Sequence, residues 1–457
     1  MQDAATDNST AANHTVTQNL AAFVANFRAH HVSPTALTWA THSLLDWSAV
    51  TLAAHAEPLV TMLRDEFADE QAGPCTLIGQ NRTARLHDAT LINGAAGHAL
   101  DYDDVVRPLG GHPSVPVMPV VLALGEQREV SGAAVLAAIV AGFEVECALG
   151  AMTGASHYER GFHNTGTIGT FGATAAACHL LGLDADTIAR AFGLAASQAA
   201  GLKCNFGTMT KPFHAGAAAA NGLRAARLAA RGFTASPCAI EAPQGFAATQ
   251  VPAFVPSAMR CDPHAAFAVE HNLFKFHAAC YGTHAALEGI RTLREVHAIG
   301  LDDMAHMMLH LPTRAAGNCD QRDPETGLQM KFSVRHLAVM GLGGADTAAL
   351  DVYSAENATH PRYVEARQRV EAVFSDEGRD RMTATVVLTT RDGQTLTANG
   401  DVGRPATDLD HQWQKLSAKF EALAEPVIGA ARTEQARSAI ARLSDASDLS
   451  DMMAALA

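Results

Sequence analysis

The feature that most constrains this chain is a helical hydrophobic period that continues from about residue 16 to residue 265. Runs such as "TQNLAAFVANFRAH" and "GAAVLAAIVAGFEVECALGAM" place apolar residues at i, i+3, i+4 and i+7, the spacing of one face of an α-helix. Alanine is abundant and aromatic residues make up only 6% of the chain, which favours closely packed helices. Because 457 residues exceed one ordinary core, we expect two domains.

The pattern changes after about residue 268. Residues 304–312 and 382–390 are predicted strands, and Asp392-Gly393 is a hairpin signal that follows the second of them. Helical patterns lie between these strands, "PRYVEARQRVEAVF" among them, and the helical period returns after residue 408. We therefore predict a mainly α protein, with a large all-helical domain built from both chain ends, 1–268 and 404–457, and an inserted smaller α+β domain, 269–403.

Charge and composition exclude several classes of partner. A formal net charge of −14 argues against binding to a nucleic-acid backbone, which needs a basic face. The N-terminus is polar and acidic, so we expect no signal peptide, and the apolar stretch 133–143 is too short to span a bilayer and is predicted to be a buried helix. The eight cysteines form no CxxC pair, which indicates reduced thiols in a cytoplasmic protein. The absence of HExxH and EF-hand motifs predicts no metal.

Lysine is scarce, with only six among the 33 lysines and arginines. Lys211, Lys275 and Lys331 all lie beside glycine, proline, histidine or aromatic residues. One lysine can persist on a solvated face by chance. Apolar neighbours make that interpretation weaker for Lys211, which is our best candidate for binding an anion.

Three histidines lie in glycine-rich breaks of the helical pattern. His112 follows two glycines, His163 lies in "ERGFHNTG", and His214 is three residues after Lys211. A single histidine is more often a hydrogen-bonded structural residue. Several of them, together with a lysine and the acidic stretch 101–104, favour acid–base chemistry.

These stretches also carry a resemblance. "NGAAGHALDYDD", "GHPSVPVMPVVLALGE", "RGFHNTGTIGTFGATAAACHLLGL", "NFGTMTKPFHAGAAAANGL" and the "KF" at 419–420 resemble the MmgE/PrpD family, in order from about residue 16 to 425. That family includes 2-methylcitrate dehydratase, cis-aconitate decarboxylase and iminodisuccinate epimerase. The resemblance implies a helical domain with a lid-like α+β domain, a homodimer, and a site between the domains that uses neither a metal nor an organic cofactor.

The resemblance also implies site residues. Asp101, His112, His163 and Lys211 match the family's catalytic positions in the DYDD, HPS, RGFH and TKP motifs. The predicted substrate-binding set is Arg107, Lys275, His277 and His336.

Two positions depart from the decarboxylase branch of that family. The branch has a threonine just after the paired aspartates and a tyrosine in the helix that here reads "SVRHLAV", whereas this chain has Val105 and His336. A cis-aconitate decarboxylase is therefore the less expected activity. The segment "NFGTMTKPFHAG" is more similar to the epimerase-like branch than to the methylcitrate dehydratases.

The reactions of such a family share a carbanion next to a carboxylate. We predict a cofactor-independent lyase of the hydratase or dehydratase type that acts on a small di- or tricarboxylate, and the alternative is an epimerase that uses the same carbanion. Lys211 is assigned to stabilise the enolate or to anchor a carboxylate. His163 and His112 are candidate base and acid, Asp101 is expected to orient a histidine or raise its pKa, and Arg107 to bind a distal carboxylate.

An alternative of another class is a catalytically silent helical dimer that serves as a binding protein. It predicts that Lys211→Ala leaves ligand handling and stability largely unchanged.

Overall fold

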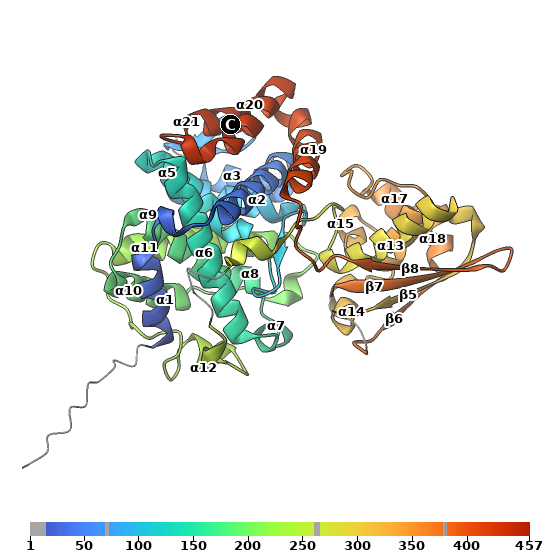
Figure 1. Ribbon diagram of the computed structural model, residues 1–457, viewed down its shortest axis with the longest axis horizontal. Helices are drawn as coiled ribbons and strands as arrows, with labels where there is room; N and C mark the ends of the chain where they lie inside the picture. The colour runs from blue at the N-terminus through green and yellow to red at the C-terminus, as the bar shows by residue number, and fades with distance from the viewer. Residues whose placement is uncertain (1–14, 69–72, 260–265, 378–379, 381) are drawn as a thin grey trace, which may run out of the picture.

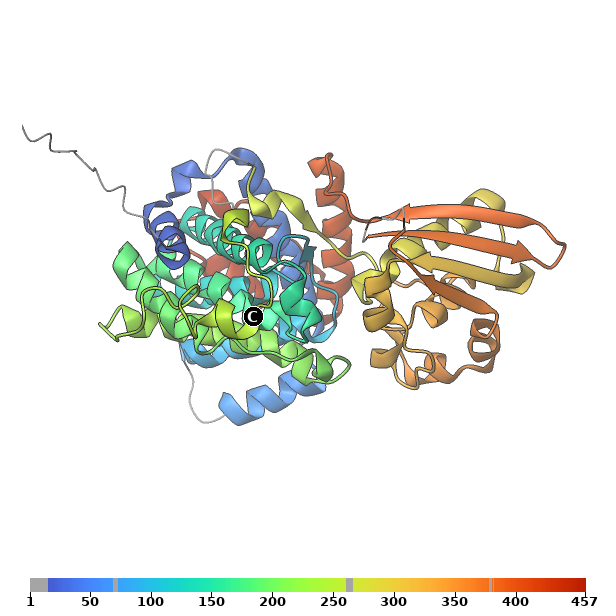
Figure 2. The ribbon, with the colours of Figure 1, turned by 90° about the horizontal axis from the view of Figure 1, so that it is seen from below.

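The computed structural model describes residues 15–68, 73–259, 266–377, 380 and 382–457. Most of the acidic N-terminal stretch, and Cys261 among the eight cysteines, lie outside the described residues. Figure 1 shows a large helical lobe beside a smaller lobe that is built on a sheet, and Figure 2 shows the same division from below. The prediction of a mainly α protein is confirmed.

Helices from both ends of the chain form the helical lobe. The helix α19 packs along α2, so the C-terminal segment covers N-terminal helices (Figure 1). One buried apolar cluster is drawn from residues 16–278 and 416–456. The helices are α1 (Val16–Asn26), α2 (Pro34–Ala53), α3 (Pro58–Phe67), α4 (Leu86–Ala99), α5 (Ser114–Arg128), α6 (Gly132–Thr153), α7 (Ser156–Glu159), α8 (Asn164–Thr167), α9 (Gly169–Leu181), α10 (Ala185–Ala196), α11 (Thr210–Ala229), α12 (Phe246–Gln250), α19 (Leu409–Ile428), α20 (Ala430–Ala441) and α21 (Ser450–Leu456).

Local sequence explains where several of these helices begin. Ser33 caps α2 by accepting a hydrogen bond from the Ala36 amide, and Pro34 occupies the first helical position, where no amide hydrogen is needed. Asp184 caps α10 in the same way. Ser33-Pro34 and Asp184 are residue types that favour helix starts, so the sequence itself indicates where both helices begin.

The helix α6 is the apolar helix of the core. The helix extends from Gly132 to Thr153, well beyond the apolar stretch 133–143 that predicted it. Within the described part of the chain, it is the one helix with the length and composition to cross a membrane. Yet 94% of its most apolar window is buried inside the protein, where α6 packs on α9. The prediction of a buried helix is confirmed.

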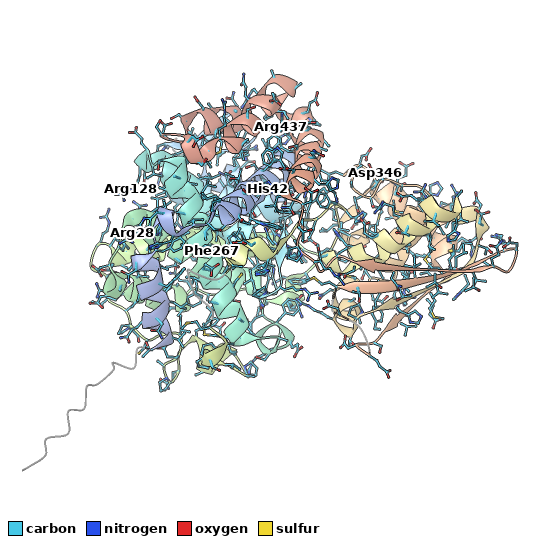
Figure 3. The ribbon with its side chains drawn as sticks, viewed as in Figure 1. Arg28, His42, Arg128, Phe267, Asp346 and Arg437 are labelled. Carbon is cyan, nitrogen blue, oxygen red and sulfur yellow. The ribbon has the colours of Figure 1, made fainter. Side chains whose placement is uncertain are left out.

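His42 illustrates how the two chain ends meet. Its side chain lies on α2 inside the helical lobe (Figure 3), and its Nδ1 accepts a hydrogen bond of 2.9 Å from the Gln412 amide on α19. Burial lowers the pKa of His42 to about 4, so the imidazole is neutral and has a lone pair for that bond.

The smaller lobe contains a four-stranded sheet of order β6-β5-β7-β8. The strand β5 pairs in parallel with β6 and antiparallel with β7, and a hairpin through Gly393, whose φ is +88°, joins β7 to β8. Its elements are α13 (Tyr281–His297), β5 (Met304–Leu311), α14 (Thr313–Cys319), α15 (Gly327–Met330), α16 (Val334–Leu342), α17 (Ala355–Thr359), α18 (Pro361–Arg367), β6 (Val370–Phe374), β7 (Thr383–Thr390) and β8 (Thr395–Asp401).

One secondary-structure prediction in this lobe is wrong. The sequence "PRYVEARQRVEAVF" was expected to be helical throughout, but the helix α18 ends at Arg367 and the chain continues as β6. Val370 and its neighbours pair with β5, which places β-branched residues on a pleated surface. A pairing between residues more than fifty positions apart therefore overrides the local helical period.

Short strands also occur within the helical lobe. β1 (Cys75–Leu77) pairs with β2 (Arg82–Ala84), and β3 (Val105–Val106) pairs with β4 (Asn272–Leu273). The second pair ties the acidic loop after α4 to the segment that leads into the sheet lobe. A separate apolar cluster within residues 285–398 forms the core of that lobe. The domain boundaries at 268/269 and 403/404 stay a prediction.

Candidate functional site

A cavity of about 340 Å³ lies where the two lobes meet. This is within the range of small-molecule sites, which occur preferentially between domains. The helical lobe contributes polar and charged side chains to its wall, and the sheet lobe contributes a thiol, aromatic rings and a guanidinium group. The principal lining residues are Asp101, Val105, Arg107, His112, Tyr158, His163, Lys211, Cys280, Tyr281, Arg314, Asn318 and Phe332.

Asp101 is the anionic centre of this wall. It follows the end of α4 with a φ of +52°, a left-handed conformation that few residues other than glycine adopt, and such conformations cluster at functional sites. Its Oδ1 accepts hydrogen bonds from the Lys211 ammonium at 2.7 Å and the Lys275 ammonium at 3.0 Å. Lys275 also donates to the Asp101 carbonyl at 2.6 Å. One buried carboxylate therefore holds two ammonium groups.

These contacts fix the charge states of the pair at the cavity. Burial lowers the pKa of Lys211, but the charge and hydrogen bond of Asp101 outweigh it, so the pKa lies above its usual value. Burial raises the pKa of Asp101, but the two lysines outweigh it and hold the pKa well below its usual value. Lys211 is thus a cation next to an anion at neutral pH, in a site largely shielded from water.

A second carboxylate, Asp103, orients two histidines. His98 Nδ1 lies 2.9 Å from Asp103 Oδ1, and His112 Nδ1 lies 2.9 Å from Asp103 Oδ2. This geometry assigns the Nδ1–H tautomer to His112 and leaves a lone pair on Nε2, which is 3.8 Å from Asp101 Oδ1. Burial lowers the pKa of His112, so the imidazole is neutral and can accept a proton.

His163 lies on the same wall, immediately before α8. Its Nδ1 is 3.1 Å from the Nδ1 of His214, so one of the two rings donates to the other. Burial, together with the nearby cations, holds the pKa of His163 well below its usual value. The carboxylate-bound His112 and the imidazole-bound His163 are therefore two neutral histidines in different surroundings.

The cluster His98, Asp101, Asp103 and His112 has ligand atoms within 4.8 Å of one another, a spacing that could hold a metal ion. The hydrogen bonds in place oppose that use. Asp101 already accepts from Lys211 and Lys275, and a divalent cation there would face two ammonium groups. The donor set fits an anionic substrate better than a cation.

The structure brings five of the predicted site residues together, namely Asp101, His112, His163, Lys211 and Lys275. Arg107 lines the rim of the same cavity, where its guanidinium pairs with Asp380. The order within the acidic loop differs from expectation, because the histidines lie closer to Asp103 than to Asp101. His98 hydrogen-bonds Asp103 and His112 Nδ1 lies 2.9 Å from it, whereas His112 Nε2 lies 3.8 Å from Asp101.

The structure places two of the predicted residues elsewhere. His277 Nδ1 bonds Thr347 Oγ1 and its Nε2 contacts Glu288, in a different cavity. His336 is buried in α16, where Nε2 donates to the Asn357 carbonyl. Neither residue lines the main cavity. The hydrogen bonds to Thr347, Glu288 and Asn357 hold both imidazoles away from it.

Lys331 is one of the few lysines that the sequence places beside aromatic residues. Its ammonium donates a hydrogen bond to the carbonyl of Leu100, the residue before Asp101. It lines a second cavity of about 320 Å³ that shares Asp101 and Lys211 with the first. Burial lowers its pKa to about 8. Lys331 therefore supports the loop after α4 from the second cavity.

Arg314 and Asn318 of the sheet lobe line the cavity although neither was among the predicted site residues. The Arg314 guanidinium stacks 4.4 Å above the Tyr158 ring, and the Tyr158 hydroxyl donates to Asn318 at 3.2 Å. Arg314 has no carboxylate partner in the part of the chain that the structure describes. No motif marks Arg314 or Asn318, because they reach the site only when α14 packs against the helical lobe.

Comparison with known proteins identifies two domains of one family in this chain. Residues 18–257 match the model of the MmgE/PrpD N-terminal domain and residues 277–445 that of the MmgE/PrpD C-terminal domain. The chain is 27% identical to cis-aconitate decarboxylase of Mus musculus over 386 residues, which cover 79% of this chain and 76% of that protein. It is 25% identical over 473 residues, and 96% of both chains, to the cis-aconitate decarboxylase-like protein oryM of Aspergillus oryzae. A stretch of 165 residues, 35% of this chain and 34% of the relative, is 36% identical to cis-aconitate decarboxylase of Homo sapiens.

Proposed function

Because the chain belongs to the MmgE/PrpD family of lyase-type enzymes, we propose that it is a cofactor-independent lyase of the hydratase or dehydratase type. Its substrate is a small di- or tricarboxylate, and the reaction passes through a carbanion next to a carboxylate. The observation that carries the proposal is the pairing of a buried ammonium, Lys211, with a neutral histidine whose tautomer is set by a carboxylate, His112, in one cavity.

The proposed mechanism begins with proton abstraction. His112 Nε2 takes the proton from the carbon next to a substrate carboxylate, and Asp103 stabilises the imidazolium that forms. Negative charge moves onto the carboxylate as an enolate, where the Lys211 ammonium stabilises it in a site of low dielectric. His163 faces the leaving group or the other face of the reacting carbon.

Substrate class follows from the local charge. The whole chain carries −14, but the cavity wall presents Lys211 and Arg314, and the Arg107–Asp380 pair lies at the rim. A guanidinium binds a carboxylate through two parallel hydrogen bonds. Arg314, which has no carboxylate partner among the described residues, is positioned to bind a second substrate carboxylate, and Arg107 is a further candidate.

A decarboxylase is the second candidate function, because the relatives compared above carry the name cis-aconitate decarboxylase. The valine at position 105, where the decarboxylase branch was expected to have threonine, lines the cavity and offers no hydrogen bond. His336 lies outside the cavity lining and supports neither activity. An epimerase uses the same base and the same ammonium, and it is distinguished by its product.

The proposed function is tested by proton NMR in deuterium oxide with citrate, 2-methylcitrate, cis-aconitate, malate, aspartate and iminodisuccinate. We expect exchange of the proton next to a carboxylate and appearance of an alkene or its hydrate. Loss of carbon dioxide identifies a decarboxylase and an inverted centre an epimerase. No exchange and no product with any of these acids would contradict the proposal and favour the binding protein of the alternative class.

Replacing Lys211 by methionine is expected to lower the rate of this exchange by about 10²–10³-fold, the usual cost of removing one stabiliser of a developing oxyanion. Methionine keeps the length of the side chain while removing the charge. The matched control is Lys415→Met, because Lys415 is exposed on α19, its Nζ lies over the Phe276 ring, and it is absent from the cavity lining. Equal rates for the two variants would contradict the role of Lys211.

The homodimer implied by the resemblance and the cytoplasmic location indicated by the cysteine pattern are part of the proposal. We expect light scattering to give a mass of twice 47.9 kDa for the purified chain. A mass of 47.9 kDa that persists at high protein concentration would contradict the dimer without touching the proposed chemistry.

A further inference from the structure

Two thiols meet at the wall that the sheet lobe presents to the cavity. Cys280 is the residue just before α13, it is partly exposed, and it lines the same cavity as Lys211 and His112. Cys319, the last residue of α14, is buried, and its thiol donates a hydrogen bond to the Cys280 sulfur across 3.4 Å. Neither residue has a role in the mechanism above.

The backbone around this pair is built for close approach. A Cβ added at Gly282 would lie 2.6 Å from the Cys319 sulfur, so glycine is needed there for α13 and α14 to bring the thiols together. The Cys280 amide donates to the Lys331 carbonyl, which fixes the residue against the segment after α15. The contact between the two sulfurs is therefore held by elements on both sides.

The charges around Cys280 come from several elements. The hydrogen bond from Cys319 lowers the pKa of the Cys280 thiol to about 7, while burial and the Asp101 carboxylate act against it. The ammonium groups of Lys275 and Lys211 add to the lowering. Ordinary thiols have a pKa near 8.5, so this one exchanges its proton more readily at neutral pH.

We propose that Cys280 is a second proton-transfer residue of this site, which delivers a proton to the substrate carbanion from the sheet lobe while His112 acts from the helical lobe. Cys319 is a positioning residue that makes the Cys280 sulfur a better proton carrier. This inference rests on the carbanion of the proposed function and deepens its epimerase alternative, because a carbanion that Cys280 protonates keeps all its substituents and ends as the inverted centre.

The proton and electron balance is complete without an added reagent. When the substrate C–H bond breaks, the proton passes to His112 Nε2 and the electron pair stays on the substrate as an enolate. When the Cys280 S–H bond breaks, its proton forms a new C–H bond and the sulfur keeps the electron pair as a thiolate. The His112 imidazolium then loses its proton to solvent and the thiolate regains one from solvent, which restores both groups.

The first test is a thiolate titration, which needs no substrate. Ultraviolet absorbance at 240 nm of the wild-type chain is expected to show a thiol that ionises near pH 7, which Cys280→Ser removes and Cys204→Ser, an exposed control, retains. In Cys319→Ala the same transition is expected about one pH unit higher, because the donated hydrogen bond is lost.

The second test measures, with the same variants, the rate at which solvent deuterium enters the inverted centre of the product. Cys280→Ser keeps the size of the side chain but has a far less acidic hydroxyl, so we expect this rate to fall by about 10²-fold or more. In Cys319→Ala the pH at which the rate is half-maximal is expected to move with the titration, which loss of packing alone would not produce.

The outcomes separate this inference from the function it rests on. If the wild-type chain exchanges a proton and Cys280→Ser keeps its rate, Cys280 is not a proton-transfer residue and the proposed function stands. If the wild-type chain exchanges no proton of any acid in the panel, the proposed function fails and this inference fails with it. A rate that falls in Cys280→Ser with an unchanged melting temperature, together with the shifted profile of Cys319→Ala, supports both.

Discussion

In the variant His112→Gln the rate of proton exchange next to the substrate carboxylate is expected to fall by about 10²–10⁴-fold, the usual contribution of a general base. The reason lies in the contact between His112 Nδ1 and Asp103, which leaves Nε2 as a lone pair in the cavity. Glutamine has a similar length but cannot take up the proton. Substrate binding is expected to change less than turnover.

The variant Asp103→Asn separates the role of His112 as base from the role of Asp103 in setting the tautomer of that base. An amide at this position no longer sets the Nδ1–H tautomer of His112, so the rate is expected to fall although the base is still present. The control is His411→Gln on the exposed side of α19. A rate for His112→Gln within a few-fold of that control would show that the proton is taken by another group, and His163 would be the next candidate.

The second large effect is expected on stability. Lys419→Met should lower the free energy of unfolding by about 3–5 kcal/mol, the usual cost of breaking a buried ion pair by removing one partner. Lys419 is on α19, and its ammonium donates to Asp46 at 2.7 Å and to the Tyr102 and Lys275 carbonyls at 2.9 Å. The variant leaves a buried carboxylate and two carbonyls without their donor.

Urea unfolding measures this loss, and the same helix supplies the control. Lys415 is exposed on α19 and its ammonium lies over the Phe276 ring, so Lys415→Met is expected to cost about 1 kcal/mol or less. The double variant Asp46→Leu/Lys419→Met removes both charges and should recover part of the loss. Equal losses for Lys419→Met and Lys415→Met would contradict the assignment.

The candidate site divides into a part that the sequence indicated and a part that it did not. His112 and His163 lie in glycine-rich breaks of a helical pattern, and such breaks are where a chain can place polar groups beside a core. Asp101 was indicated by the acidic stretch and Lys211, in the first turn of α11, by the scarcity of lysine. Arg314 lies in no such break. It is on α14, and it reaches the cavity only because the two lobes pack together.

The roles within the acidic loop also needed the structure. Asp101 and Asp103 are two residues apart, and the sequence gives no reason to assign one to lysines and the other to histidines. The left-handed backbone at Asp101, with a φ of +52°, turns its carboxylate toward Lys211 and Lys275 and leaves Asp103 to His98 and His112. The folded loop, and not the spacing of its residues, therefore decides which carboxylate has which partner.

By itself the sequence determined the helical class of the protein, the existence of a later segment with strands, and the positions of the main charged groups, because periodicity and turn residues act over a few positions along the chain. The tertiary structure alone decided that residues 370–374 form a strand, that His277 and His336 turn away from the cavity, and that Cys280 meets Cys319. Each of these depends on contacts between segments distant in the chain, whose energies no local pattern contains.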